Sequence, residues 1–423
     1  MNNNYEDKFI QNIKNTNYKN LSETHQLFFK NIALEYRFSF QELKQLIDFT
    51  IDFKMWNEKD IVEVFKDEYA NKKMAFNHIR DIWNELKSKP NTYKSFDKSY
   101  SSDKRKISFE KIETETLSLG SCPVASPNTR CCNLLTLDSV ESCGFDCSYC
   151  SIQSFYNQNR VAFDVNFAQK LKNLKLNPNE NYHIGTGQSS DSLMWGNREG
   201  ILDALFEFAR ANPNVILEFK TKSNKIEYFL QNEVPSNIIC TWSLNTPVII
   251  ENEEHLTATL NQRIDAARKL ANKGVLVGFH FHPIVHYENY LDDYKKVYES
   301  LMNTFEVKEV VLISFGTLTF IKPVIQKLRG RAFKSKILQM SFVDANGKAS
   351  YPLEIKREMF KHAYDSFKAW HKDVYFYLCM EDHSLWREVF GYEYISNNQM
   401  EDMMKMAYWE KIRNKDNKIL NKI

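Results

Sequence analysis

The sequence predicts an α/β fold in which a parallel sheet, open or curled into a barrel, follows an additional helical N-terminal domain. From Cys122 onward, short β-rich runs alternate with helical segments, a pattern typical of parallel strands joined by helices. Residues 1–90, in contrast, have only helical periodicity. The 423 residues are 43% hydrophobic, which is enough for a large core and a second, smaller domain.

The helical domain is expected to cover residues 1–90. Ser39 with Glu42 three positions later is a capping-box pattern, which starts a helix. Asn57 is expected to cap the following helix. Residues 91–120 are polar and charged, so we expect them to form a linker or an arm around the next domain.

The sheet is expected within residues 121–382, and residues 383–423 are expected to form a C-terminal helical extension. The β-rich runs that we expect as strands are 182–187, 215–222, 238–245, 275–284, 309–316, 335–342 and 373–380. In folds of this kind the active site lies at the C-terminal ends of the strands.

Composition points to a cytoplasmic protein without a membrane partner. The N-terminus lacks the basic-then-apolar pattern of a signal peptide, and no apolar run approaches the roughly 20 residues of a spanning helix. The net charge of +2 argues neither for nor against a polyanionic partner. Eight cysteines, several at short spacing, favour metal or redox chemistry over a disulfide framework in such a chain.

Three of these cysteines, Cys143, Cys147 and Cys150, have the spacing Cys-x3-Cys-x2-Cys. A [4Fe–4S] cluster normally takes four thiolates, so a loop that offers three leaves one iron open, as a catalytic metal requires. Zinc is the competing occupant but needs a fourth ligand nearby. The remaining alternative is three unrelated buried thiols.

At these cysteines the chain resembles the radical S-adenosylmethionine (SAM) superfamily, in which the open iron binds SAM and the cluster cleaves it to a 5′-deoxyadenosyl radical. From Ser139 to Asp382 the order of motifs is similar to the spore photoproduct lyase family, radical SAM enzymes that repair a thymine dimer in DNA. The matching motifs are CGFDCSYCSIQ, TGQSSD, FKTK, SLN, RIDAARKLANKG, VGFHFHPI, FIKP and VYFYLCMED. The resemblance implies a partial (β/α) TIM-type barrel, a [4Fe–4S] cluster, SAM, and an electron donor such as flavodoxin or ferredoxin.

The resemblance also implies which residues bind SAM: Tyr149, Gly185, Gly187, Ser189, Lys222 and Ser243. The two glycines let the backbone approach a ligand closely, although a structural turn would need them too. Lys222 ends an expected strand and could pair with the SAM carboxylate, or be an ordinary solvated lysine. Ser243 falls on the polar face of its run, or is a hydrogen-bonded core serine. Tyr149 also matches a tyrosine of the family's catalytic relay.

Two residues depart from the family pattern. Gln188 stands where the repair enzymes carry a hydrogen-donating cysteine, and Ser151 stands where they carry a tyrosine. An amide cannot donate a hydrogen atom as a thiol does. His282 replaces a small residue and, with His280 and His286, would form a histidine-bearing edge. These histidines could be an acid/base or substrate contact, or they could be polar residues with hydrogen-bond partners at the barrel rim. We expect Gln188 and His282 to be catalytic.

A second cysteine group, Cys122, Cys131 and Cys132, precedes the first. It could bind a second metal, supply the missing hydrogen-donor thiol, or be structural. Cys240 and Cys379 are expected in the core.

Two basic runs suggest nucleic acid as a partner. Residues 86–106 hold seven Lys/Arg against two acids, with Tyr93, Phe96 and Tyr100 among them. Residues 322–336 hold six basic residues and no acid. Such patches suit a phosphate backbone with stacked bases, and they are also common on ordinary surfaces.

Three functions remain open at this point. The first is a radical SAM enzyme with a nucleic-acid substrate and a lyase-like or repair-like outcome. The second is a radical SAM enzyme that modifies a peptide, a protein or a small molecule. The third is a non-catalytic iron–sulfur regulator that binds nucleic acid.

Overall fold

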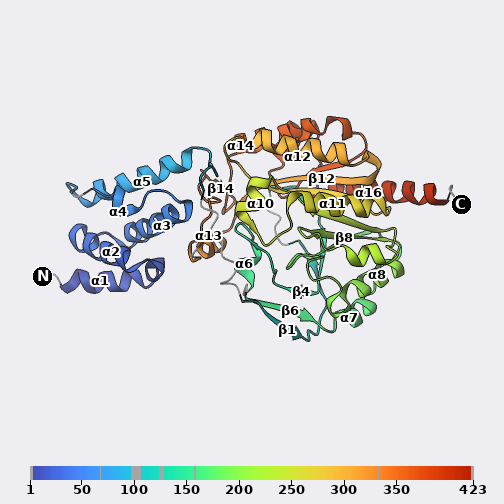
Figure 1. Cartoon of the computed structure of the whole chain (residues 1–423), viewed down its shortest axis with the longest axis horizontal. Helices are drawn as coiled ribbons and strands as arrows, with labels where there is room; N and C mark the ends of the chain where they lie inside the picture. Colours follow the sequence, from blue (N-terminus) through green and yellow to red (C-terminus); the bar gives the residue numbers. More distant parts are fainter. Residues whose placement is uncertain are drawn as a thin grey trace.

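The computed structural model describes residues 3–66, 68–96, 106–122, 128–156, 159–331 and 333–420. A block of helices lies at one end of the molecule, a barrel fills the rest, and the C-terminal helix projects at the other end (Figure 1). Among the described residues, no helix has the length and apolar character that crossing a membrane requires.

The barrel is built on one eight-stranded sheet with the order β16-β12-β11-β9-β8-β7-β3-β2. Its strands are β2 (Ser118–Ser121), β3 (Leu135–Asp138), β7 (Tyr182–Thr186), β8 (Val215–Thr221), β9 (Ile238–Ser243), β11 (Leu276–Ile284), β12 (Val310–Thr317) and β16 (Tyr375–Leu378). Every neighbouring pair is parallel except β2 and β3. The sheet does not close, which confirms the predicted partial (β/α) barrel.

Helices lie between successive strands and cover the outer face of the sheet (Figure 1). They are α7 (Phe167–Asn173), α8 (Ile201–Ala211), α9 (Glu227–Gln231), α10 (Pro247–Glu253), α11 (Leu260–Asn272), α12 (Tyr290–Thr304), α14 (Leu353–Ser366) and α15 (Ser384–Phe390). Strands β9 and β12 are buried along almost their whole length, as expected for parallel strands covered on both faces.

The open seam between β16 and β2 is bridged by residues 128–134. Thr129 forms an isolated bridge with Asp382, and the N–H of Cys131 donates to Oδ1 of Asn397 at 3.1 Å. Asn397 begins α16 (Asn397–Leu420), which crosses the N-terminal end of the barrel, where Lys411 donates to the carbonyl of Val310. The second cysteine group is therefore fixed at the seam.

The helical block contains α1 (Asn3–Ile13), α2 (Glu23–Tyr36), α3 (Phe40–Trp56), α4 (Ile61–Val64) and α5 (Lys72–Ser88). The predicted capping box of Ser39 and Glu42 is present at the start of α3. The prediction for Asn57 is wrong: it ends α3 in the left-handed conformation, with φ of 60°, and α4 is instead capped by Asp60. Asparagine adopts this conformation more readily than most residues.

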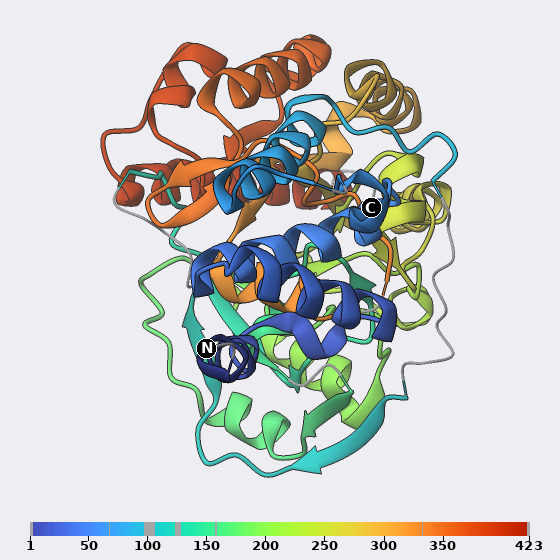
Figure 2. The same cartoon turned by 90° about the vertical axis from the view of Figure 1, so that its left-hand side faces the viewer.

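The block packs on α13 (Lys322–Arg329) and on the loop that follows it, in front of the barrel in Figure 2. The fully buried Asp52 accepts hydrogen bonds from Nε and Nη2 of Arg329 at 2.8 and 2.7 Å, and from the indole N–H of Trp83 at 2.8 Å. A buried carboxylate paired in this way joins the two parts of the chain.

Residues 335–342, predicted as a strand, form this docking loop instead. The N–H of Ser335 donates to the carbonyl of Met55 at 2.9 Å, and the ammonium of Lys336 reaches Glu58 at 3.1 Å. The loop satisfies its polar groups against the block, so its apolar Ile337 does not signal a sheet.

The segment predicted as an arm contributes strands. β1 (Ser108–Ile112) pairs with β6 (Arg160–Asp164), which also pairs with β4 (Val140–Glu141), and β2 joins the main sheet. A further small sheet contains β13 (Thr319–Phe320), β14 (Val343–Ala345) and β15 (Lys348–Ser350).

Candidate functional site

The cysteine triplet lies on a loop at the C-terminal end of the barrel. Cys143 follows β4, Cys147 ends β5 (Asp146–Cys147), and Cys150 precedes α6 (Ile152–Phe155). None of the three forms a disulfide; Cys147 is buried, and Cys143 and Cys150 are half-buried. Burial raises the pKa of each, to about 12 for Cys147, and the charges of Cys147 and Cys150 raise the pKa of Cys143 further. The three sulfurs therefore share one buried environment.

No three His, Cys, Asp or Glu side chains in the described ranges are placed to hold a single metal ion.

Two consecutive acids, Glu253 and Glu254, hold the cysteine loop from below. Glu254 begins β10 (Glu254–His255), which pairs antiparallel with β5. The N–H of Ser148 donates to the carbonyl of Glu253 at 2.8 Å, and its hydroxyl donates to the Glu253 carboxylate. The same carboxylate accepts from Ser335 at 2.6 Å and from Tyr93 at 2.9 Å. The loop is thereby tied to the docking loop and to the arm.

Glu254 organises the charged groups beside the cysteines. Its carboxylate accepts a hydrogen bond from Tyr149 and lies 2.6 Å from the guanidinium of Arg263 and 3.3 Å from the ammonium of Lys222. Burial alone would raise the pKa of Glu254, but Arg263 and Lys222 outweigh burial and lower it to about 2. Lys222 also donates to the Tyr149 hydroxyl at 2.7 Å and lies 3.8 Å from Sγ of Cys147.

The glycine turn after β7 is a rigid structural element. Gly187 has φ of 77°, and a Cβ there would lie 2.6 Å from Oγ of Ser192. The hydroxyl of Ser189, predicted to contact SAM, donates to the carbonyl of Val140 at 2.8 Å. Asp191 accepts from the N–H of Lys222 at 2.7 Å, so the turn also positions the end of β8.

A cavity of about 240 Å³ occupies the barrel lumen beside this turn, and Gly185, Gln188, Ser151 and His282 line it. Four thiols line it as well: Cys122, Cys131, Cys132 and Cys379. Cys379, predicted in the core, thus joins the second cysteine group, whereas Cys240 is fully buried in β9 as predicted. Ser243, at the end of β9, is buried and supplies its carbonyl to Arg263 at 2.8 Å.

The predicted histidine edge is divided. His280 and His282 share one face of β11, as alternation predicts, and both contact Oγ of Ser314, at 2.6 and 3.0 Å. His286 lies apart. Its backbone N–H donates to the Tyr351 hydroxyl at 3.1 Å, and its ring packs on Tyr290 with centroids 4.8 Å apart.

Sequence reasoning missed Glu218, Lys220, Glu253, Glu254 and Arg263. The first two had a usable signal, since charged residues at alternate positions of an otherwise apolar strand share one face. Glu218 and Lys220 on β8 both line the lumen cavity.

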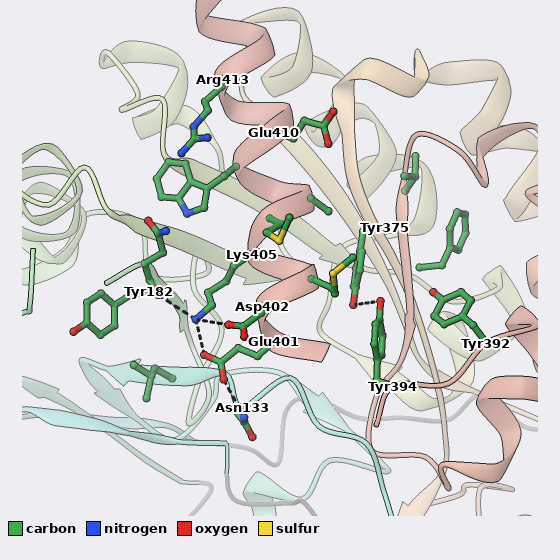
Figure 3. A pocket seen from close by; sticks show the side chains of 18 of the residues that line it. Asn133, Tyr182, Tyr375, Tyr392, Tyr394, Glu401, Asp402, Lys405, Glu410 and Arg413 are labelled. Carbon is green, nitrogen blue, oxygen red and sulfur yellow. Dashed lines mark hydrogen bonds and ion pairs between the residues drawn. The ribbon is translucent and has the colours of Figure 1, made fainter. Parts of the chain in front are cut away.

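A larger cavity of about 1610 Å³ lies at the opposite, N-terminal end of the strands, beside α16. In Figure 3 Lys405 pairs with two acids of its own helix, Glu401 at 2.9 Å and Asp402 at 3.9 Å. Tyr375 and Tyr394 likewise join through their hydroxyls at 3.1 Å. Asn133 donates to Glu401 at 2.9 Å and Lys405 donates to the carbonyl of Asn181 at 3.2 Å, and these two bonds hold α16 on the barrel.

Four basic side chains of the run 322–336 form hydrogen bonds or ion pairs within the chain. Their internal partners are Asp52 for Arg329, Asp146 for Arg331, Asn57 for Lys334 and Glu58 for Lys336. In the run 86–106, Lys89 pairs with Glu85 and Lys94 with Glu288, whereas Lys98, Tyr100, Lys104 and Arg105 lie outside the described residues.

The family model described as spore photoproduct lyase matches residues 136–348, half of the chain. The chain belongs to the spore photoproduct lyase family. This match contains the cysteine loop, the glycine turn, Lys222 and both histidines of the lumen. Membership confirms the predicted resemblance to the radical SAM superfamily.

Curated relatives in the family include the spore photoproduct lyase of Clostridium acetobutylicum, 27% identical over 200 residues, and that of a Geobacillus species, 25% identical over 202. These alignments cover 45% and 46% of this chain, and the chain spans 59% of the length of each relative.

Solved structures of spore photoproduct lyase share the fold. A mutant matches with a TM-score of 0.53 and 19% identity, covering 64% of this chain and 82% of its own. A mutant with bound AdoMet and dinucleoside spore photoproduct matches with a TM-score of 0.52 and 19% identity, covering 64% of this chain and 81% of its own.

Proposed function

We propose that the protein is a radical SAM enzyme that uses a [4Fe–4S] cluster on Cys143, Cys147 and Cys150. The observation that carries this proposal is the placement of Lys222, whose ammonium lies 3.8 Å from Sγ of Cys147. A cation fixed beside the cysteine triplet suits an anionic cofactor group next to a cluster.

The residues present fit the cluster and SAM. The loop offers three thiols and no fourth, and Glu253 and Glu254 hold it in place before any metal binds. When bound, the cluster and SAM supply a 5′-deoxyadenosyl radical that abstracts a hydrogen atom. Lys222 would pair with the SAM carboxylate. Glu254 keeps the ammonium of Lys222 charged and holds it beside Cys147.

The other predicted cofactor residues take different parts. Tyr149 is held by Lys222 and Glu254, so its ring can flank the adenine. Gly185 and Gly187 shape the turn, and Ser189 fixes that turn to β4 through its hydroxyl. Ser243 would present its side chain to the bound cofactor from the end of β9.

Nucleic acid is the substrate class that we favour, with a repair-like or lyase-like outcome. The family name supports it, and so does the dinucleoside spore photoproduct named for the related structure. Gln188 in the lumen favours a second candidate, modification of a peptide, a protein or a small molecule, because a thiol is missing at this position.

Anaerobic reconstitution tests the cofactor chemistry. With iron, sulfide, dithionite and SAM, the wild type should form 5′-deoxyadenosine, and Cys147→Ala should not. Cys240→Ala is the matched control, because this buried thiol lies in β9 away from the loop. A wild type that holds the cluster and forms no 5′-deoxyadenosine would refute the enzyme and leave the non-catalytic regulator.

Deuterium transfer then separates the substrates. Deuterium from labelled DNA containing spore photoproduct should appear in 5′-deoxyadenosine. Transfer only from labelled peptides, or from a small molecule, would replace nucleic acid with the second candidate.

A further inference from the structure

A buried carboxylate in the barrel lumen sets the proton positions of its neighbours. Glu218, 3% exposed, accepts hydrogen bonds from Thr241 at 2.6 Å, and from Nε2 of His280 and of His183 at 2.8 Å each. An ionised carboxylate can only accept, so both imidazoles carry a proton on Nε2.

This proton placement propagates along β11 and β12. Neutral His280 has a lone pair on Nδ1, so the hydroxyl of Ser314, 2.6 Å away, must donate to it. The Ser314 hydroxyl has no second proton to donate. Its oxygen must therefore accept the hydrogen bond of 3.0 Å from the Nε2–H of His282. Nδ1 of His282 is therefore an acceptor, and the ammonium of Lys220 donates to it over a long 3.5 Å contact.

Nδ1 of His282 belongs to a side chain that lines the lumen cavity. His282, Gln188 and Lys220 all line it, and the ammonium of Lys220 lies 3.5 Å from Nδ1 of His282. The cavity thus presents a proton acceptor and a fixed cation side by side. An N–H or O–H group that loses its proton there would find a counter-charge for the resulting anion.

We propose that Glu218, His280, Ser314 and His282 form a proton relay, and that Nδ1 of His282 is the catalytic base of the lumen. This rests on the proposed function for the identity of the substrate, for which the relay indicates an ionisable N–H group such as the imide of a nucleobase. His282 is the catalytic residue, and Ser314, His280 and Glu218 are positioning residues.

The transfer balances without any electron change. The substrate N–H gives its proton to Nδ1 of His282, the Nε2 proton of His282 passes to Ser314, and the Ser314 proton passes to Nδ1 of His280. The products are a substrate anion beside Lys220, a neutral His282 of the opposite tautomer, and a His280 imidazolium paired with Glu218.

Burial and the neighbouring charges keep the two imidazoles of the relay neutral at rest. Burial, then Lys220, lower the pKa of His280 to about 4, and they lower the pKa of His282 as well, with Lys222 and His280 adding to the effect. Glu218 opposes the lowering at both rings. Cys240, Tyr377 and Tyr408 also face Glu218, and as neutral groups they add no charge.

Nuclear magnetic resonance of the full chain, with ¹⁵N-labelled histidine at pH 7, tests the relay directly. His280 and His282 should both be protonated on Nε2. Ser314→Ala should leave His280 protonated on Nε2, held by Glu218, and should shift the Nε2–H signals of His282, because this ring N–H loses its acceptor. Ser314→Thr should keep the wild-type signals of His282. Ser341→Ala, which removes an exposed hydroxyl outside the site, is the control.

A His282 protonated on Nδ1 in the wild type, or one that Ser314→Ala does not change, would overturn the relay. These results do not depend on the cluster. A wild type without 5′-deoxyadenosine formation would refute the proposed function and leave the tautomers as they are. With dinucleoside spore photoproduct as the probe, Ser314→Ala should lower turnover at least tenfold, whereas the control Ser341→Ala should leave turnover unchanged.

Discussion

Replacing Arg329 with methionine should loosen the helical block from the barrel. Asp52 is fully buried and receives two hydrogen bonds from Arg329. Removing one partner of a buried ion pair typically costs about 3–5 kcal/mol, because the other charge stays buried without compensation. Trp83 still donates one bond to Asp52 in the variant, so we expect a loss of about 3 kcal/mol, at the lower end of this range.

Urea unfolding followed by tryptophan fluorescence measures this loss. Trp56 and Trp83 stack in the block with centroids 6.2 Å apart, so they report on its unfolding. A loss of this size should lower the midpoint by roughly 1–3 M, given m-values of about 1–3 kcal/mol/M. The double variant Arg329→Met with Asp52→Asn should recover part of the loss, since the stranded charge is gone.

The matched control is Arg80→Met. The Arg80 side chain is 44% exposed, and its Nε lies 3.8 Å from the carboxylate of Asp81. A surface pair contributes about 0–1 kcal/mol, so the control should unfold almost as the wild type does. If Arg329→Met costs less than about 1 kcal/mol, or if the double variant is no more stable than the single one, the buried pair does not join the two parts.

Three further outcomes are expected. Glu253→Ala should lower the iron bound per chain after reconstitution, because the cysteine loop loses the acceptor of Ser148; the exposed Glu251→Ala on the same helix should bind iron normally, and equal iron in both would contradict the role. Lys222→Met should weaken SAM binding at least tenfold in a reconstituted titration with unchanged iron content, whereas an unchanged affinity would remove Lys222 from the cofactor site. His280 has a folded pKa of about 4 against 6.5 unfolded, so its contribution to stability is complete above pH 6.5 and is lost as the pH falls toward 4. Between pH 7 and pH 5 the wild type should therefore lose about 2 kcal/mol more stability to urea than His280→Gln does, and equal losses in the two proteins would contradict this.

Much of the barrel could be predicted because each strand carries its own local signal. Residues 215–222 and 275–284 became β8 and β11 within one residue at each end. The run 335–342 has the same apolar texture, but its buried Ser335 and Lys336 find partners in the helical block. Periodicity contains no information about such distant partners.

The site was predictable to a different degree. The cysteine spacing is a local pattern, and it located the loop. The grip of Glu253 and Glu254 on that loop joins residues more than a hundred positions apart, and β10 is only two residues long. The meeting of Cys379 with Cys132 likewise depends on how the seam closes, which no local pattern specifies.

The docking loop connects the helical block to the cysteine loop. Ser335 uses its backbone N–H on Met55 of the block and its hydroxyl on Glu253 below the cysteines. A partner that pulled the block aside would therefore strain the same short segment that steadies Ser148. A macromolecule that binds the helical block would therefore act on the cysteine loop through Ser335 and Glu253.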